Sequence, residues 1–552
     1  MIKYTFTIEP EHLVSLRGLI SFSDNVEFAL SKETRSLPKV ILHKIVMEIS
    51  RLSPLTNGML ELQELLKKEV CSEVLQPMSI RCSTADRLRP LNLPLYHDFV
   101  NKDWNISQHA AIVKDVKWLL NYVSGSFCLS KWNEVTINLA RKGNHSCCRT
   151  SLEINDPEEL AQNSDAIHNS KSKLKSRQMM LNGERPSECA YCWKQEDQHT
   201  EHVSHRVLLS MLHIKDFYRI LEAGVGADYA QTQVEIYSTS TCQLKCFYCG
   251  PLYSSSWKSE LIEKNSYKLR HGVMFAVKEE DTSLSNISPF LMAYETAWKK
   301  WYPHLTTLRF TGGEPLLATQ LWKMLDYVTE HPSADLTISI NSNLCVGDKR
   351  ISRLKDKLSK VKGKAKEVWI HASGEATNEQ MEYIRFGSNY QQWLGNIESI
   401  LEDTDSFVKV TVMNTVNVLC YSTFIDQVKD ILAIRKKYHD RVVLMSFKYL
   451  FTPQFGDVRM LPQKLKNKFV FELGELIKDY SGENPYEEGL LTESEVYSVQ
   501  RLIDHAKMEP DSTHTEADLK MFFKEYDSRR GTSFSKTFPE LAQAINFDEE
   551  SK

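Results

Sequence analysis

The chain has 552 residues, of which 42% are hydrophobic, and this length and composition predict several domains with packed cores. The formal net charge of −4 gives no overall attraction to nucleic acid. Twelve cysteines, without a signal peptide or a long apolar run, argue against a disulfide scaffold or a membrane protein and predict a cytoplasmic location.

The first 120 residues contain no motif that indicates a chemistry, and we expect residues 1–120 to form an accessory domain of unknown role. A group of cysteines follows within residues 121–225. Its members are Cys128, the adjacent Cys147 and Cys148, and the pair Cys189 and Cys192. Thiolates at such spacings hold either zinc or an iron-sulfur cluster, and the residues alone leave both possibilities open.

Residues 226–455 alternate β-branched or aromatic runs with helical or loop stretches, which favours a parallel sheet curled toward a barrel. The predicted fold class is α/β, with a partial (β/α)6 TIM-like barrel preceded by the small cysteine-rich region and the N-terminal accessory domain. Reactive groups in such a barrel gather at the carboxyl ends of the strands. Residues 456–552 predict a mostly helical extension. The six predicted strands cover residues 233–238, 306–311, 336–341, 367–373, 408–415 and 442–448.

Three further cysteines come directly after the first predicted strand. Cys242, Cys246 and Cys249 lie in the run Ser-Thr-Cys-Gln-Leu-Lys-Cys-Phe-Tyr-Cys. This spacing can hold three corners of a cubane iron-sulfur cluster and leave the fourth iron without a protein ligand. Similar thiolate spacings also serve zinc sites, where four soft ligands close a tetrahedron.

A glycine turn follows the second predicted strand. Gly312, Gly313, Glu314 and Pro315 stand between that strand and an amphipathic stretch over residues 316–328. Two glycines without Cβ atoms let a small molecule lie against the backbone, and Pro315 suits the first position of a helix. Glu314 can accept hydrogen bonds from an ammonium group.

The cysteine triad, with the aromatic Tyr248 before its last cysteine, and the Gly-Gly-Glu-Pro turn together resemble the signature of the radical S-adenosylmethionine (SAM) enzymes. The resemblance implies that Cys242, Cys246 and Cys249 hold a [4Fe-4S] cluster, at which SAM is cleaved reductively to a 5′-deoxyadenosyl radical. For Asn343, Ser373 and Arg385 an ordinary loop or helix role stays open, and no residue indicates the catalytic acid or base. The residues that the resemblance suggests for SAM binding are Tyr248, Gly312, Gly313, Glu314, Asn343, Ser373 and Arg385.

The upstream cysteines resemble an auxiliary-cluster domain of the same family. Fourteen residues separate Cys128 from Gly143 and four more separate Gly143 from Cys148, which is the opening pattern of the SPASM domain. No cysteine lies between Cys192 and Cys242, so the region resembles the shortened form, the twitch domain. The resemblance implies one auxiliary [4Fe-4S] cluster, although a zinc knuckle from the same thiolates stays the alternative. The implied ligands are Cys128, Cys148, Cys189 and Cys192, with Cys147 as the substitute for Cys148.

Auxiliary-cluster domains of this kind resemble those of peptide maturases. We therefore expect an enzyme that modifies a peptide or protein side chain and takes electrons from a partner such as flavodoxin or ferredoxin. One alternative is a radical SAM enzyme acting on a small molecule or nucleotide, and another is a zinc-binding protein that interacts with nucleic acid. We expect neither a membrane nor a nucleic acid as partner, because the one basic stretch, residues 350–366, fits a solvated helix better than a nucleic-acid site.

Overall fold

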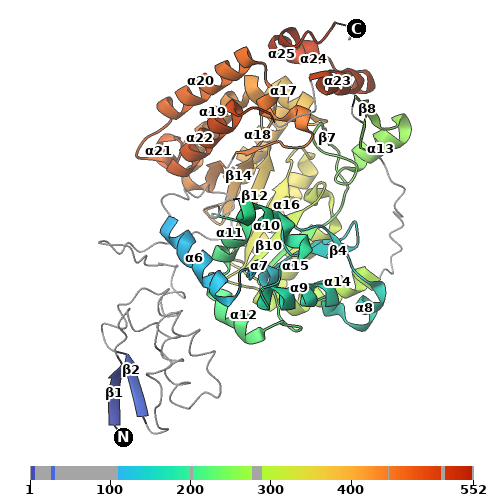
Figure 1. The fold of residues 1–552 in the computed structure, drawn as a ribbon. Helices are drawn as coiled ribbons and strands as arrows, with labels where there is room; N and C mark the ends of the chain where they lie inside the picture. Colours follow the sequence, from blue (N-terminus) through green and yellow to red (C-terminus); the bar gives the residue numbers. More distant parts are fainter. Residues whose placement is uncertain are drawn as a thin grey trace.

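The computed structural model describes residues 2–6, 26–30, 110–198, 203–270, 272–275, 289–444, 447–510 and 516–549. These residues form an α/β structure around one mixed sheet of nine strands (Figure 1). The order across the sheet is β16-β14-β12-β11-β10-β6-β3-β4-β5. The first seven strands are parallel to one another, and β4 and β5 are antiparallel additions at one edge.

All six strands predicted from the sequence lie in this sheet as parallel neighbours, in their order along the chain. The last one is shorter than predicted, because Lys448–Tyr449 (β17) pairs with Thr415–Val416 (β15) in a separate two-stranded sheet. The bounds of the six are β6 Gln233–Tyr237, β10 Thr307–Thr311, β11 Thr337–Ser342, β12 Glu367–Ser373, β14 Val408–Met413 and β16 Val442–Leu444.

The cysteine-rich region supplies a seventh parallel strand that the sequence analysis did not predict. This strand, β3 (Glu134–Asn138), pairs with β6, so the sheet continues into the region before residue 226. Antiparallel β4 (Gly143–His145) and β5 (Glu153–Ile154) complete it. A Cβ on Gly143 would lie 2.3 Å from the carbonyl oxygen of Glu153, so this close pairing requires glycine.

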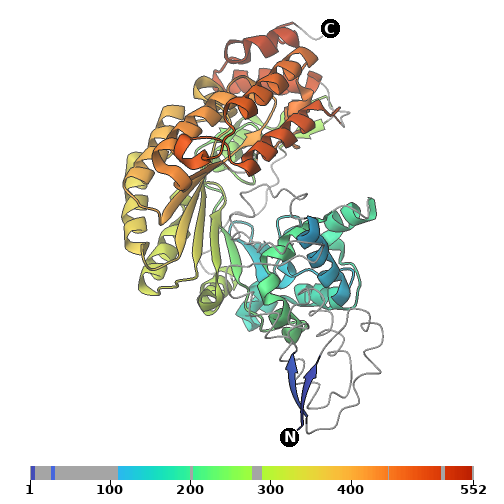
Figure 2. The same cartoon turned by 90° about the vertical axis from the view of Figure 1, so that its left-hand side faces the viewer.

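Side chains alternate across the parallel strands. Leu308, Phe310 and Ile340 are fully buried in the core. Helices that connect the strands cover one face of the sheet (Figure 2). The opposite face, called the inner face here, carries polar residues such as Arg309 and Asn341. Parallel sheets normally carry apolar residues on both faces, so the polar residues of the inner face are a departure from the usual pattern. The covering helices are α15 Thr319–Glu330, α16 Asp348–Val361, α18 Tyr390–Glu402 and α19 Phe424–Tyr438.

The cysteine-rich region has a hydrophobic core of its own, which includes Leu120, Phe127, Trp132 and Met211. Cys192 belongs to this core, and Cys128 and Cys189 pack against it. Its helices are α6 Ala110–Val123, α7 Ser130–Asn133, α8 Pro157–Gln162, α9 Lys171–Leu181, α10 Ala190–Gln198, α11 His205–Leu212 and α12 Phe217–Ala223.

The connection between β6 and β10 is long and contains small elements of its own. They are β7 Lys245–Cys246, α13 Ser255–Lys264, β8 Tyr267–Leu269, β9 Gly272–Met274 and α14 Pro289–Trp301. β7 pairs antiparallel with β13 (Arg385–Phe386), which follows α17 (Asn378–Ile384). This pairing ties the cysteine triad to a segment more than a hundred residues away in the chain.

Helices follow the last strands toward the C-terminus. Arg435 of α19 and Glu495 of α22 form a buried pair in which Arg435 Nη1 donates to Glu495 Oε2 at 2.7 Å. Glu495 also accepts a hydrogen bond from the backbone N–H of Leu444 at 2.8 Å, so the pair holds α22 against the end of β16. The helices are α20 Gln463–Asp479, α21 Pro485–Glu488, α22 Glu493–Lys507, α23 Glu516–Arg530, α24 Phe534–Thr537 and α25 Pro539–Ala544.

The structure describes only a small part of the accessory domain predicted for residues 1–120. Strands β1 (Ile2–Phe6) and β2 (Val26–Leu30) pair in parallel, and α6 begins at Ala110. The rest of that prediction lies outside the described residues. Among the helices that the structure describes, none has both the length and the apolar character needed to span a bilayer.

Replacement of Glu495 by Gln should lower the free energy of unfolding by about 3–5 kcal/mol, because the Arg435 guanidinium would stay buried without its counter-charge. Urea unfolding followed by circular dichroism measures this change. Lys437→Met is the matched control, since Lys437 pairs with Glu402 on the exposed surface and its loss should move the midpoint little. Equal midpoints for the Glu495→Gln variant and the wild type would contradict the role of the pair.

Candidate functional site

The cysteine triad and the glycine turn meet at the carboxyl edge of the sheet. β6 ends at Tyr237 and leads into the cysteine loop, residues 238–250, while β10 ends at Thr311 and leads into the turn of residues 312–315. β11 ends at Ser342, next to Asn343. Because adjacent parallel strands end at the same edge, these three connections come together in space.

The glycine turn packs directly on the backbone that precedes Cys242. Gly313 N donates to Thr239 O at 2.7 Å, and Glu314 N donates to Thr241 O at 2.8 Å. Gly312 has a φ of +120°, and a Cβ there would lie 2.6 Å from Thr239 O. At Gly313 a Cβ would lie 2.5 Å from Thr241 O. This backbone contact therefore requires glycine at both positions.

Glu314 joins the ends of β10 and β11. Its side chain is fully buried, and Oε1 accepts hydrogen bonds from Ser342 Oγ at 2.9 Å and Leu316 N at 3.0 Å. Oε2 accepts from Asn343 N at 2.8 Å. Burial raises the pKa of Glu314 to about 7 even though all three hydrogen bonds lower it. Its predicted contact with an ammonium group stays a prediction.

N–H donors lie beside two sulfur atoms of the triad. Cys242 and Cys246 are buried and Cys249 is half-buried. Asn343 Nδ2 lies 3.7 Å from Cys242 Sγ, and Arg385 Nη1 lies 3.9 Å from Cys246 Sγ. Burial raises the pKa of Cys242 and of Cys249 to about 12, and the neighbouring Cys246 contributes to both shifts. The free thiols are therefore protonated at neutral pH, and binding of a metal would release their protons.

Glu375 is a site residue that the sequence analysis missed. Arg385 donates from Nε and Nη2 to Glu375 Oε2 at 2.9 and 2.7 Å, and the Tyr248 hydroxyl donates to Glu375 Oε1 at 2.9 Å. Arg385 also lies in β13, opposite Cys246 of β7. The structure thus places both Tyr248 and Arg385 in a buried network next to the triad. The sequence held one signal for Glu375, its position just after the end of β12.

Helix α23, in the C-terminal part of the chain, supports the cysteine loop from another side. Arg530 Nε donates to Glu260 Oε2 at 3.1 Å, and the same oxygen accepts from Lys245 Nζ at 2.7 Å. The Arg530 guanidinium also lies 3.7 Å from the centre of the Tyr526 ring. Because Lys245 precedes Cys246, this chain of contacts links the C-terminal part of the protein to the triad. No local pattern in the sequence indicated this link.

Two more residues lie at this edge of the sheet. Ser373 is the last residue of β12 and lies opposite Met413 of β14. Cys345 follows Asn343 on the loop after β11, and its Sγ lies 3.9 Å from Asn389 O. Its backbone N–H donates to Asn343 Oδ1 at 2.9 Å, which fixes the amide that faces Cys242. The SAM contact suggested for Ser373 stays a prediction.

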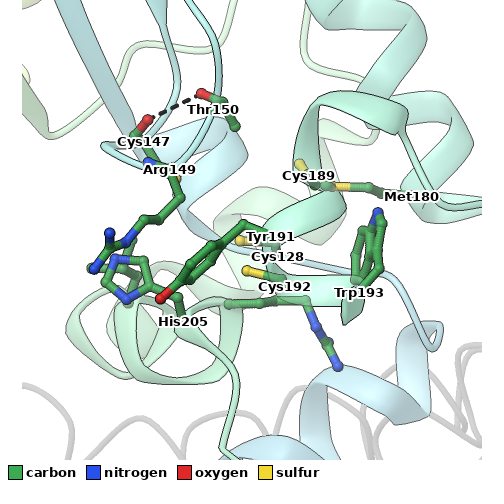
Figure 3. Close-up of a pocket in the computed structure, with 12 residues that line it drawn as sticks. Cys128, Cys147, Arg149, Thr150, Met180, Cys189, Tyr191, Cys192, Trp193 and His205 are labelled. Carbon is green, nitrogen blue, oxygen red and sulfur yellow. Dashed lines mark hydrogen bonds between the residues drawn. The ribbon is translucent and has the colours of Figure 1, made fainter. Parts of the chain in front are cut away.

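The upstream cysteines line a separate pocket, called the auxiliary pocket here. Cys128, Cys189 and Cys192 lie on its α10 side, and Cys147 belongs to the opposite wall (Figure 3). Cys148, which the sequence analysis named as a ligand, is not among its lining residues. The Cys148 thiol is instead 3.4 Å from His205 Nε2. The pocket therefore contains Cys147, the residue named as the substitute.

Basic side chains lie close to the thiols of the auxiliary pocket. The buried Lys131 pairs with Glu188 at 2.9 Å, and it lowers the pKa of Cys189, which burial raises to about 11. Burial likewise raises the pKa of Cys128, and Arg206 opposes that shift. A thiolate cluster is anionic, so buried cations beside it favour its binding.

The residue types at both sites suit soft metal centres, because each site contains several thiols with N–H donors or a cation next to sulfur. Among the described residues, no group of three His, Cys, Asp or Glu side chains is arranged to hold a metal ion. The basic stretch forms most of α16, where Lys355 and Lys357 pair with Asp403 and Asp326 on the surface.

No model of a known protein family matches the chain, and a search of curated protein sequences finds no match.

Replacement of Gly313 by Ala should destabilise the protein by about 1–3 kcal/mol, because the new Cβ would overlap the Thr241 carbonyl and push the cysteine loop away. Thermal unfolding gives the change in stability. Gly395→Ala is the matched control. It lies within α18, where a Cβ meets nothing within 4 Å, so alanine should be neutral or slightly stabilising there. An unchanged melting temperature for Gly313→Ala would rule out the close contact.

The raised pKa of Glu314 predicts that the stability of the protein falls as the pH rises from 4.5 to 7. Between its ordinary pKa of 4.5 and its raised value of about 7, the unfolded chain is ionised at this group while the folded protein keeps the proton. The folded state then binds more protons, so this group's contribution to stability falls as pH rises, by up to about 1.4 kcal/mol per pH unit. The unfolding free energy of the wild type minus that of Glu314→Gln should therefore fall as the pH rises from 4.5 to 7. Urea titration at a series of pH values measures this difference. Parallel pH profiles would show that Glu314 ionises normally.

Proposed function

We propose that this protein is a radical SAM enzyme that modifies a side chain of a peptide or protein. The triad Cys242, Cys246 and Cys249 would hold a [4Fe-4S] cluster with one iron free of protein ligands. With SAM bound, the cluster would supply the one-electron chemistry that yields a 5′-deoxyadenosyl radical able to remove hydrogen from an unactivated carbon. The electron would come from a small cytoplasmic carrier such as flavodoxin or ferredoxin.

The observation that carries the proposal is the backbone contact between the cysteine loop and the glycine turn. Two hydrogen bonds and two glycines without room for a Cβ hold these segments together at the carboxyl edge of the sheet. The cysteine triad and the glycine turn could each resemble the family independently of the other. Their contact at one edge of the sheet supports a shared site. The parallel sheet with helices on one face is also compatible with the partial barrel that the family resemblance implies.

The residues of this chain would hold the cofactors and keep water from them. Asn343 and Arg385 would direct N–H groups at cluster sulfurs, which makes a reduced, more anionic cluster easier to form. Glu375 and Tyr248 fix the orientation of Arg385. Backbone groups of the glycine turn, kept in place by Glu314, would contact the methionyl part of SAM.

The auxiliary pocket supports a second metal centre. Its thiols from Cys128, Cys147, Cys189 and Cys192 come from three separate segments, which fits a centre that forms only in the folded protein. We propose an auxiliary [4Fe-4S] cluster there, because Lys131 and Arg206, which pair with Glu188 and Glu196, still act to lower the pKa of Cys189 and of Cys128 and so favour their thiolates. Zinc at the same four thiols is the alternative that metal analysis decides.

Anaerobic reconstitution followed by metal analysis and a SAM cleavage assay tests the proposal. We expect about eight irons per chain and formation of 5′-deoxyadenosine after reduction. Cys246→Ala should abolish cleavage, because the triad would lose a ligand, whereas Cys189→Ala should retain part of it. Cys420→Ala is the matched control, since this thiol is also buried but bonds the backbone of Asn417. Bound zinc without iron, or cleavage that survives Cys246→Ala, would refute the proposal.

A further inference from the structure

A cavity of about 390 Å³ lies at the carboxyl edge of the sheet, beside the backbone that leads to the cysteine loop. It is lined by segments that follow three neighbouring strands, namely residues 139–142 after β3, residues 238–241 after β6 and residues 317–320 beyond β10. Neither the triad cysteines nor the two glycines of the turn line it, so the cavity is separate from the candidate site. Its volume and its place at this edge are typical of sites for small molecules.

The lining of the cavity includes a positive charge but no negative one. Lys142 is its charged residue, and the other polar residues carry hydroxyl or amide groups. The Lys142 side chain is half-buried and forms no hydrogen bond or ion pair with any residue that the structure describes. An ammonium group that is partly withdrawn from water and lacks a counter-charge favours an anion beside it.

A buried hydroxyl group in the lining is left without a short hydrogen bond. Ser238 lines the cavity, and only 6% of its surface is exposed. Within the described segments its Oγ forms one hydrogen bond, a long one of 3.5 Å to the carbonyl oxygen of Ile236. A hydroxyl buried this deeply normally has a well-formed partner, so Ser238 indicates that a polar group of a ligand belongs in the cavity.

The N-terminus of α15 provides further donors. Ala318 is the N-cap residue and offers no side chain that accepts from the N–H groups of the first turn. Ala318, Thr319 and Gln320 all line the cavity. The free N–H groups and the partial positive charge of a helix N-terminus both favour a phosphate.

We propose that this cavity binds a small organic phosphate. The phosphate group would lie between the Lys142 ammonium and the first turn of α15, with the Ser238 hydroxyl as another donor. Its three terminal oxygens can accept from all of these groups, whereas a carboxylate has only two oxygens. The apolar side chains of Leu139, Leu291 and Leu317 line the remaining wall and would contact an apolar organic group of the ligand.

This phosphate site goes beyond the proposed function and does not depend on it. Thr239 and Thr241, whose carbonyl oxygens accept hydrogen bonds from the glycine turn, belong to the lining of the cavity. A bound phosphate ester would therefore contact the segment that precedes Cys242 without contacting the triad. Phosphate binding by a protein that cleaves no SAM would refute the proposed function and leave this site standing.

Isothermal titration calorimetry of the full-length protein with phenyl phosphate tests the assignment. We expect a dissociation constant of about 1 mM or lower. Inorganic phosphate lacks the apolar group and benzoate carries a carboxylate instead, so each should bind at least ~10-fold more weakly. Absence of phenyl phosphate binding, or equally tight binding of either comparison ligand, would overturn the assignment.

Two variants should weaken binding by different routes. Lys142 has a φ of +54°, a conformation that asparagine tolerates, so Lys142→Asn should fold normally and bind phenyl phosphate at least ~10-fold more weakly. Thr319→Glu adds a negative charge at the first residue of α15, which stabilises the helix but repels a phosphate. Binding should then be lost while the melting temperature stays the same or rises.

Lys349→Asn is the matched control. This lysine is exposed and does not line the cavity, and its replacement changes the net charge by the same amount as Lys142→Asn. Its affinity for phenyl phosphate should equal that of the wild type. Wild-type affinity in either the Lys142→Asn or the Thr319→Glu variant would show that the ligand binds elsewhere and would overturn the assignment.

Discussion

The structure depends most on the close approach of two backbone segments, the one before Cys242 and the turn at Gly312 and Gly313. Any Cβ at these glycines would meet a carbonyl oxygen at 2.5–2.6 Å, a separation at which repulsion outweighs every attraction nearby. The hydrogen bonds across the contact then set the position of the cysteine loop relative to β10. A shift of this turn would therefore displace the loop that carries Cys242, Cys246 and Cys249.

Buried carboxylates complete the support of the cysteine loop. Glu314 binds the ends of two strands, Glu375 orients Arg385 beside Cys246, and Glu260 connects Lys245 to Arg530. A buried carboxylate is stable only when donors or cations surround it, so each of the three demands partners from distant parts of the chain. The cysteine loop is thus held by β11, by the β12–α17 connection and by α23 together.

The continuous sheet gives the two thiol sites a common frame. Because β3 pairs with β6, the auxiliary pocket and the triad are positioned by adjacent strands rather than by a mobile linker. The polar inner face lies beside both.

Much of this architecture was determined by the sequence itself. Runs of β-branched residues predicted six strands, and all six are parallel neighbours in the sheet, because alternating strand and helix periodicity depends only on local residue order. Cysteine spacing and the glycine turn, which are local patterns as well, identified the candidate residues. Tertiary structure alone decided that β3 joins the sheet, that Cys147 and not Cys148 lines the auxiliary pocket, and that Glu375, Glu260 and Arg530 support the triad. These outcomes rest on contacts between segments up to 270 residues apart, whose partners no local periodicity or spacing can reveal.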